Sequence, residues 1–138
     1  MQHVRAKLHR TAFLSYSSKD ADFVEHCIQG MQKVNPILDV FYAPASMRSG
    51  QRWKEALRRE ILERDIMYLF WSEAASKSEW VDWEWRFGLA ERGINFIDPC
   101  PLVSPEEVPP PKELADELHF NDWILAYKRA RTARKDAG

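Results

Sequence analysis

The stretch Ile66-Met67-Tyr68-Leu69-Phe70-Trp71 decides the fold class. Its apolar and aromatic residues follow one another without the polar alternation of a half-exposed strand. This pattern is typical of a strand that is covered on both faces, and such strands belong to parallel sheets with helices above and below. The run is also too short to cross a membrane. We therefore expect Ile66–Trp71 to be a central strand of a parallel sheet.

Strand-like and helix-like segments alternate along the rest of the chain. Strict alternation of this kind predicts a parallel sheet with helices on both faces. The expected fold is a flavodoxin-like three-layer sandwich with a central, mostly parallel five-stranded sheet, whose ligand site lies at the carboxyl ends of the strands. The expected strands are 11–16, 38–42, 66–71, 95–97 (resuming at 101–103) and 119–120, and the expected helices are 21–34, 53–64, 78–92 and 122–134.

Composition limits the possible classes of function. The 138 residues suggest one domain, and 20 basic against 21 acidic residues exclude the charge of a general nucleic-acid binder. No apolar run is long enough for a membrane span. Cys27 and Cys100 and the four scattered histidines show no metal-ligand spacing, so we expect reduced thiols, a cytoplasmic location and no metal. The expected organisation is a lead-in at 1–10, one domain at 11–134 and a tail at 135–138, which leaves room for a fused or separate sensor domain.

A second stretch, Ser76 to Trp85, concentrates aromatic and acidic residues. Ser76 followed by Glu79 has the spacing of a capping box, which predicts that a helix starts here. On that helix Trp80 and Glu84 are four residues apart and share a face. An indole excludes water from a neighbouring carboxylate, which raises the pKa of a carboxyl group and strengthens its attraction for positive charge. The alternative is that the tryptophans are core residues and Glu84 is a surface charge.

Several enzyme classes are excluded by missing motifs. The chain has no Walker loop, no GxGxxG and no Gly-x-Ser-x-Gly. What remains at the expected sheet edge is one carboxylate, too few for ordinary glycoside hydrolysis. One carboxylate could suffice where the leaving group departs unaided, as neutral nicotinamide does from NAD⁺. A carboxylate would then stabilise the ribosyl cation, and Arg48 or Lys19 could meet the diphosphate.

Three motifs in order resemble the bacterial TIR (Toll/interleukin-1 receptor) domain family. Residues 12–17, Ala-Phe-Leu-Ser-Tyr-Ser, resemble the first box of the family. Residues 39–53 resemble its second strand and BB loop, including the glycine, here Gly50, before the next helix. Ser78-x-Trp80-Val81-x-x-Glu84 resembles the Trp-x-x-x-Glu signature of TIR domains that cleave NAD⁺. The resemblance covers about residues 11–128, nearly the whole chain.

The resemblance implies roles for particular residues. Glu84 would be the catalytic residue and Trp80 part of the pocket. Ser15, Tyr16 and Ser17 would line the site, and the BB loop, Pro44–Arg52 with Arg48, would cover it and join neighbouring copies in a homo-oligomer. The implied activity is that of an NAD⁺ glycohydrolase of bacterial antiviral immunity, releasing nicotinamide and ADP-ribose or a cyclised isomer. NAD⁺ would be the substrate, and no cofactor is expected.

Two alternatives remain open. The chain could be a non-enzymatic adaptor that only assembles signalling complexes, or an enzyme like nucleoside deoxyribosyltransferases, which share this architecture and also place a glutamate on a ribosyl carbon. Under each of these hypotheses, the side chains near Trp80 and Glu84 have structural roles only. We expect Glu79, Asp82 and Glu91 to be solvated charges, Trp83 and Trp85 to serve packing, and Trp53 to anchor its helix.

Overall fold

A parallel four-stranded sheet forms the centre of the molecule. The computed structural model describes residues 9–42 and 53–137, with side chains as far as Thr132. The strands are β1 (Thr11–Ser15), β2 (Asp39–Phe41), β3 (Ile66–Trp71) and β4 (Ile97–Pro101). Their order is β2-β1-β3-β4, and every neighbouring pair is parallel. The strand order reverses between β1 and β3, as in flavodoxin-like folds.

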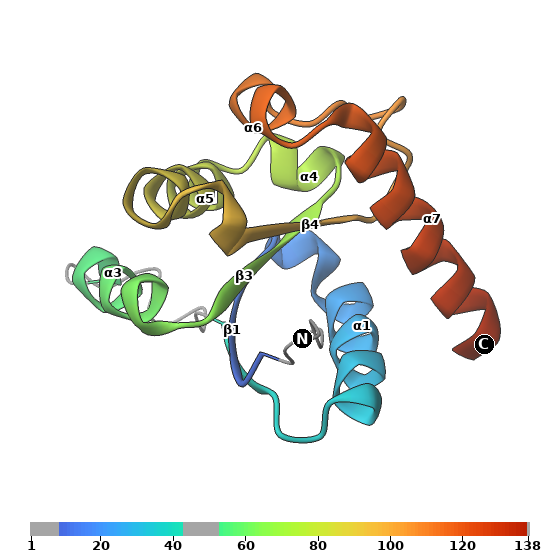
Figure 1. Ribbon diagram of the computed structural model, residues 1–138, viewed down its shortest axis with the longest axis horizontal. Helices are drawn as coiled ribbons and strands as arrows, with labels where there is room; N and C mark the ends of the chain where they lie inside the picture. The colour runs from blue at the N-terminus through green and yellow to red at the C-terminus, as the bar shows by residue number, and fades with distance from the viewer. Residues whose placement is uncertain (1–8, 43–52, 138) are drawn as a thin grey trace, which may run out of the picture.

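Helices cover both faces of this sheet. Figure 1 shows α3 and α5 on one side and α1 and α7 on the other, which confirms the expected three-layer architecture. The α-helices are α1 (Ala21–Val34), α3 (Trp53–Glu63), α4 (Glu73–Ser76), α5 (Glu79–Arg92), α6 (Lys112–Glu117) and α7 (Phe120–Ala137), and the short 3-10 helices are η1 (Ser18–Asp20) and η2 (Ile94–Phe96).

Each face of the sheet has its own hydrophobic core. Side chains alternate along β3, so Met67 and Leu69 pack beneath α3 and α5, Trp71 on the same face packs against the start of α7, and Phe70 packs beneath α1. All four of these side chains are buried. The continuous apolar run of β3 is thus explained by burial on both faces, as the sequence predicted.

The expected fifth strand at 119–120 is wrong for the described residues. Phe120 is instead the first residue of α7, and the backbone N–H of Asp122 donates to the carbonyl of His119 at 2.8 Å, which closes a helical turn there. Two apolar or aromatic residues are too short a signal to separate a strand from the start of a helix. The sheet therefore has four strands in the part of the chain that the structure describes.

The expected fourth strand was also misplaced. Residues 94–96 form η2, and the strand runs through the Asp98-Pro99-Cys100 segment that the prediction had left out. The backbone N–H of Leu102 donates to the carbonyl of Trp71 at 2.7 Å. Because backbone N–H groups point alternately to the two sides of a strand, the backbone nitrogens of Pro99 and Pro101 face away from β3. At an edge strand such positions tolerate proline, since no ladder hydrogen bond is lost.

The start of α5 differs from the expected capping box. Ser78, not Ser76, is the N-cap, and its hydroxyl oxygen accepts from the backbone N–H of Val81 at 3.1 Å. Ser76 belongs to the short helix α4, where its hydroxyl donates to the carbonyl of Glu73 at 2.6 Å. The far end of α5 is as predicted. Gly93 ends it with a φ of 81°, in the region that favours glycine.

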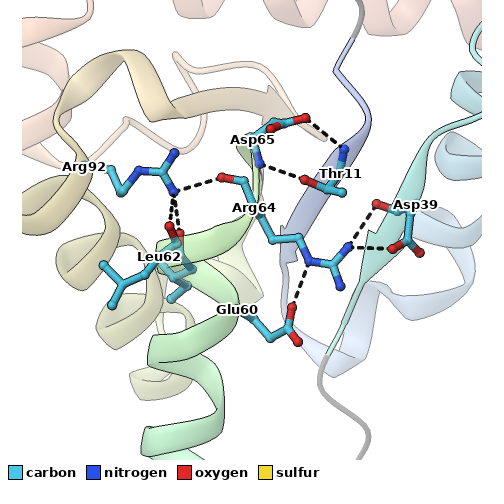
Figure 2. A network of polar contacts seen from close by, with 8 residues as sticks. Thr11, Asp39, Glu60, Leu62, Arg64, Asp65 and Arg92 are labelled. Carbon is cyan, nitrogen blue, oxygen red and sulfur yellow. Dashed lines mark hydrogen bonds and ion pairs between the residues drawn. The ribbon is translucent and has the colours of Figure 1, made fainter.

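An arginine joins α5 to the end of α3 (Figure 2). Nη1 of Arg92 donates to the carbonyl oxygens of Ile61, Leu62 and Arg64 at 2.8, 3.0 and 2.8 Å. The last carbonyl groups of a helix have no partner within the helix, so the guanidinium satisfies acceptors that α3 cannot satisfy itself. The same guanidinium lies over the ring of Phe96, 4.2 Å from its centroid.

Replacement of Arg92 with methionine is expected to lower the free energy of unfolding by about 2 kcal/mol, because partly buried carbonyl groups lose a charged donor. Urea unfolding measures the loss. The matched control is Arg86→Met on the same helix. Arg86 is about half exposed and pairs with Asp82 and Glu113 on the surface. Its replacement should therefore lower the free energy of unfolding by less than about 1 kcal/mol. Equal losses in both variants would contradict the role given to Arg92.

A second group of contacts in Figure 2 lies where the strands begin. Nη1 of Arg64 donates to the Asp39 carboxylate at 3.0 Å, and Nε donates to Glu60 at 2.8 Å. The backbone N–H of Asp65 donates to the hydroxyl of Thr11 at 2.9 Å, and an Asp65 carboxylate oxygen accepts from the Thr11 N–H at 3.2 Å. These contacts tie the starts of β1, β2 and β3 together, at the end of the sheet opposite the expected ligand site.

Tyr68 gives the fold a dependence on alkaline pH. Burial, with smaller contributions from Asp98 and Cys100, raises the pKa of its hydroxyl from 10.0 to about 12. Between these values the folded chain keeps a proton that the unfolded chain loses. Stability should therefore fall as the pH rises from about 10 to about 12, by on the order of 1–2 kcal/mol.

The check for Tyr68 is urea unfolding across that pH range. In Tyr68→Phe, the free energy of unfolding should decrease less over this pH range than in the wild type. In Tyr42→Phe, at an exposed position, the decrease should equal that of the wild type. Parallel curves for the wild type and Tyr68→Phe would show that the Tyr68 hydroxyl does not titrate differently on unfolding.

Candidate functional site

The candidate site lies where the strand order reverses. The chain passes from β1 to β2 on one side and returns to β3 on the other, so the connections that leave β1 and β3 diverge at the carboxyl ends of these strands, where sheets of this kind bind their ligands. Ser15 is the last residue of β1, and Trp71 is the last residue of β3. The helix that follows on the β3 side, α5, brings Glu84 to the same place.

Glu84 is a buried carboxylate that is held by a strand-end hydroxyl. Oγ of Ser15 donates to Oε1 of Glu84 at 2.8 Å, across 69 residues of sequence. Glu84 is 1% exposed and Ser15 is fully buried. A carboxylate shielded from water interacts more strongly with nearby charge than a solvated one. The alternative that Glu84 is a surface charge is therefore excluded.

The local sequence explains how Glu84 reaches this position. Val81, Trp85 and Gly88 form the buried face of α5, and Glu84 lies on that face. Gly88 permits a close approach to the sheet, since a Cβ added there would lie 3.1 Å from Cε of Met67. A helix that packs this closely projects Glu84 toward β1 instead of toward solvent.

A second polar contact joins the loops that leave β1 and β3. Oγ of Ser72 donates to Oδ2 of Asp20 at 2.6 Å and accepts from the backbone N–H of Ala75 at 3.0 Å. Ser72 therefore caps α4 while it holds the end of η1. Sequence reasoning missed this pair, although both residues occupy N-cap positions, Ser72 of α4 and Asp20 of α1. The contact joins the two segments that leave the carboxyl ends of β1 and β3.

Trp80 lies one turn before Glu84 and packs against Trp53 of α3. The two rings are half-buried, with centroids 4.5 Å apart and planes inclined by 32°. Trp83 contacts the edge of Trp53 at 5.6 Å and stacks on Phe87 at 5.3 Å. Trp53 thus anchors α3 against α5, as expected, and Trp83 and the buried Trp85 serve packing.

The other predicted site residues lie in different surroundings. Tyr16 follows Ser15, so its side chain is on the opposite face of the sheet and packs with the core beneath α1. Ser17 is buried, and its hydroxyl oxygen accepts from the backbone N–H of Lys19 at 3.3 Å. Lys19 itself is exposed. Arg48 and the segment Pro44–Arg52 lie outside the described residues. The structure therefore brings Ser15 and Glu84 together, but places the Tyr16 side chain elsewhere.

The neighbouring acids are exposed, as expected for Glu79, Asp82 and Glu91. Asp82 pairs with Nε of Arg86 at 2.9 Å. Cys27 and Cys100 are both partly buried. Within the described residues, no group of three or more His, Cys, Asp or Glu side chains is arranged to hold a metal ion. In the same residues, none of the helices combines the length and apolar character needed to cross a bilayer.

A shallow cavity of about 370 Å³ lies away from Glu84, between α7 and the beginning of β4. Its lining includes Ile97, Asp98 and Arg129, and neither Ser15 nor Glu84 contributes to it. Since parallel strands carry their ligand sites at the carboxyl ends, this cavity is at the wrong end of β4 for the candidate site.

Comparison with known protein families finds a match to the TIR domain family over residues 12–134. Ser15, Trp80 and Glu84 all lie within the matched range. Comparison with curated proteins finds no match.

Proposed function

Because the chain belongs to the TIR domain family, we propose that it is an NAD⁺ glycohydrolase, which cleaves the bond between nicotinamide and ribose. One observation carries the proposal. A single carboxylate, Glu84, is shielded from water and hydrogen-bonded by Ser15 at the switch point of the sheet. A side chain of this kind suits a reaction in which positive charge develops on a sugar.

The proposed step begins with cleavage of the C–N bond at C1′ of the nicotinamide ribose. The bonding pair leaves with the ring nitrogen, so nicotinamide departs neutral and an oxocarbenium ion remains. Water adds to C1′ and loses a proton, which gives ADP-ribose. A nitrogen of the adenine ring can take the place of water, which gives a cyclised isomer. Glu84 stabilises the cation electrostatically and can accept hydrogen bonds from the ribose hydroxyls.

Other residues are proposed to bind the substrate. Trp80, one turn before Glu84, supplies a flat apolar wall for the ribose or a ring. Ser15 and Ser17 lie at the end of β1, and Lys19 is an exposed cation beside them that can meet the diphosphate. From the family resemblance, Arg48 and the backbone at Tyr16 complete this set.

The burial of Glu84 bears on activation. A carboxylate that is 1% exposed reaches a sugar carbon only if neighbouring groups move. TIR domains associate with one another, and we propose that association through the Pro44–Arg52 segment opens and completes the site, as in an antiviral effector that a sensor brings together. The isolated domain should then be nearly inactive.

The same burial favours a second candidate, a non-enzymatic adaptor. A buried Glu84 that binds Ser15 also ties α5 to β1, and this contact would serve stability alone if no substrate entered. A transferase acting on deoxynucleosides is the third candidate, because it would use the same glutamate at C1′ of a deoxyribose.

The test is nicotinamide release from NAD⁺ by protein clustered on multivalent beads. The wild type should release nicotinamide when clustered and much less when dispersed, and Glu84→Ala should be silent in both states. A folded Glu84→Ala variant with unchanged turnover would overturn the mechanism, and a clustered wild type without turnover would favour the adaptor. Transfer of deoxyribose from deoxyinosine to free adenine, without nicotinamide release, would identify the transferase.

A further inference from the structure

Trp53 stands between two tryptophans of the neighbouring helix. Its ring lies over Trp80, with centroids 4.5 Å apart and an inclination of 32°, and meets the edge of Trp83 at 5.6 Å and 79°. Nζ of Lys54 lies 5.3 Å from the Trp53 ring centroid. Trp53, Trp80 and Trp83 together form an indole cluster. Offset and edge-on contacts are the favoured geometries of aromatic pairs, so each contact restricts the rotamer of its partner.

Topology places the Trp53–Trp80 contact at the candidate site. α3 follows β2 and α5 follows β3, so both helices start at the carboxyl edge of the sheet. Trp53 is the first residue of α3, and Trp80 lies in the first turn of α5. The contact therefore occurs at the same edge as Glu84, which shares a helix face with Trp80.

The attachment of α3 to α5 does not depend on this contact alone. Leu57 and Ile61 of α3 and Val81 and Trp85 of α5 are buried together in the core. Trp53 and Trp80 are only half-buried beyond that core. The contact between the two indoles therefore adds to an attachment that the fully buried residues already make.

We propose that Trp53 is a positioning residue that holds the Trp80 indole in the orientation that receives the substrate. This inference rests on the proposed function. Without the Trp53 ring, Trp80 loses one of the contacts that restrict its rotamer, and ordering it again would oppose substrate binding. Trp53 touches Trp80 and not the reacting atoms, so its effect should appear in substrate binding more than in the chemical step.

The experiment measures KM and kcat for NAD⁺ with clustered protein. Trp53→Leu should raise KM about tenfold and change kcat by less than about threefold, because apolar volume is kept but the flat ring is lost. Trp53→Phe should restore KM to within about threefold of the wild type. Trp83→Leu is the matched control, since it removes a different contact of the indole cluster and should leave KM nearly unchanged. Trp53→Met replaces the leucine variant if that variant does not fold.

A second readout needs no activity. In protein labelled with 5-fluorotryptophan, the Trp80 resonance is assigned by its loss in Trp80→Phe. It should broaden or shift in Trp53→Leu and stay sharp in Trp53→Phe. An active wild type with unchanged KM in Trp53→Leu overturns the positioning role and leaves the proposed function standing. A clustered wild type that releases no nicotinamide overturns both, and KM raised equally by Trp83→Leu would show that packing of the whole cluster, not Trp53, is responsible.

Discussion

Replacement of Glu84 with glutamine is expected to lower nicotinamide release by about a hundredfold to a thousandfold. Glutamine has nearly the same shape, and its carbonyl oxygen can still accept the hydrogen bond from Ser15 that Oε1 of Glu84 accepts at 2.8 Å. What disappears is the negative charge that would oppose the developing ribosyl cation. Loss of one preorganised electrostatic contact costs about this factor in other enzymes. The rate is measured on clustered protein at saturating NAD⁺.

The matched control is Glu91→Gln, which removes an exposed carboxylate two turns further along α5. It changes the net charge by the same amount, so its rate should match the wild type. Urea unfolding of Glu84→Gln separates loss of charge from loss of fold, because the added amide N–H₂ group is buried and should cost about 1–3 kcal/mol. A folded Glu84→Gln variant with wild-type turnover would exclude a catalytic carboxylate here.

Replacement of Trp123 with alanine is expected to lower the free energy of unfolding by about 3–5 kcal/mol, the largest effect on stability that we anticipate. Trp123 is fully buried on α7, and its ring meets the edge of Trp71 with centroids 6.3 Å apart. Trp71 in turn donates from Nε1 to the carbonyl of Pro109 at 3.0 Å. Alanine would leave a cavity where α7 packs against the sheet. A domain of this size typically has a free energy of unfolding of about 5–15 kcal/mol, so the midpoint temperature of thermal unfolding should fall sharply.

Trp123→Phe distinguishes packing from hydrogen bonding. Among the described residues, Nε1 of Trp123 has no hydrogen-bond partner. Phenylalanine removes this buried donor and keeps most of the ring, so it should cost only about 1–2 kcal/mol. A loss as large as that of alanine would mean that Nε1 makes a contact in solution, for example with a buried water molecule.

Some elements could be predicted because one local signal dominated. Ile66–Trp71 has a continuous apolar pattern, and α1 has a regular apolar face that ends before Asn35-Pro36, so the structure reproduces both ranges. Other elements depend on context. Proline inside a strand is acceptable only at an edge, so β4 could not be recognised at Pro99 before the strand order was known. The helix α4 has four residues, too few for any periodic signal.

The candidate site also combines features that the sequence predicts with features that depend on packing. Topology predicted that the end of β1 and the start of α5 meet, and the structure places Ser15 beside Glu84. Alternation along a strand could have shown that Tyr16 faces the other way. The contacts of Trp53 with Trp80 and of Ser72 with Asp20 join elements far apart in the chain. Such contacts depend on how elements pack, and spacing within one element does not encode them.

The prolines of β4 limit how copies of this domain can join. Pro99 and Pro101 occupy the outward backbone positions of the edge strand, and proline has no N–H to offer a neighbouring chain. Backbone pairing with an added strand is therefore disfavoured at the β4 edge of the sheet. At this border, a second copy of the domain can join only through side chains of helices and loops.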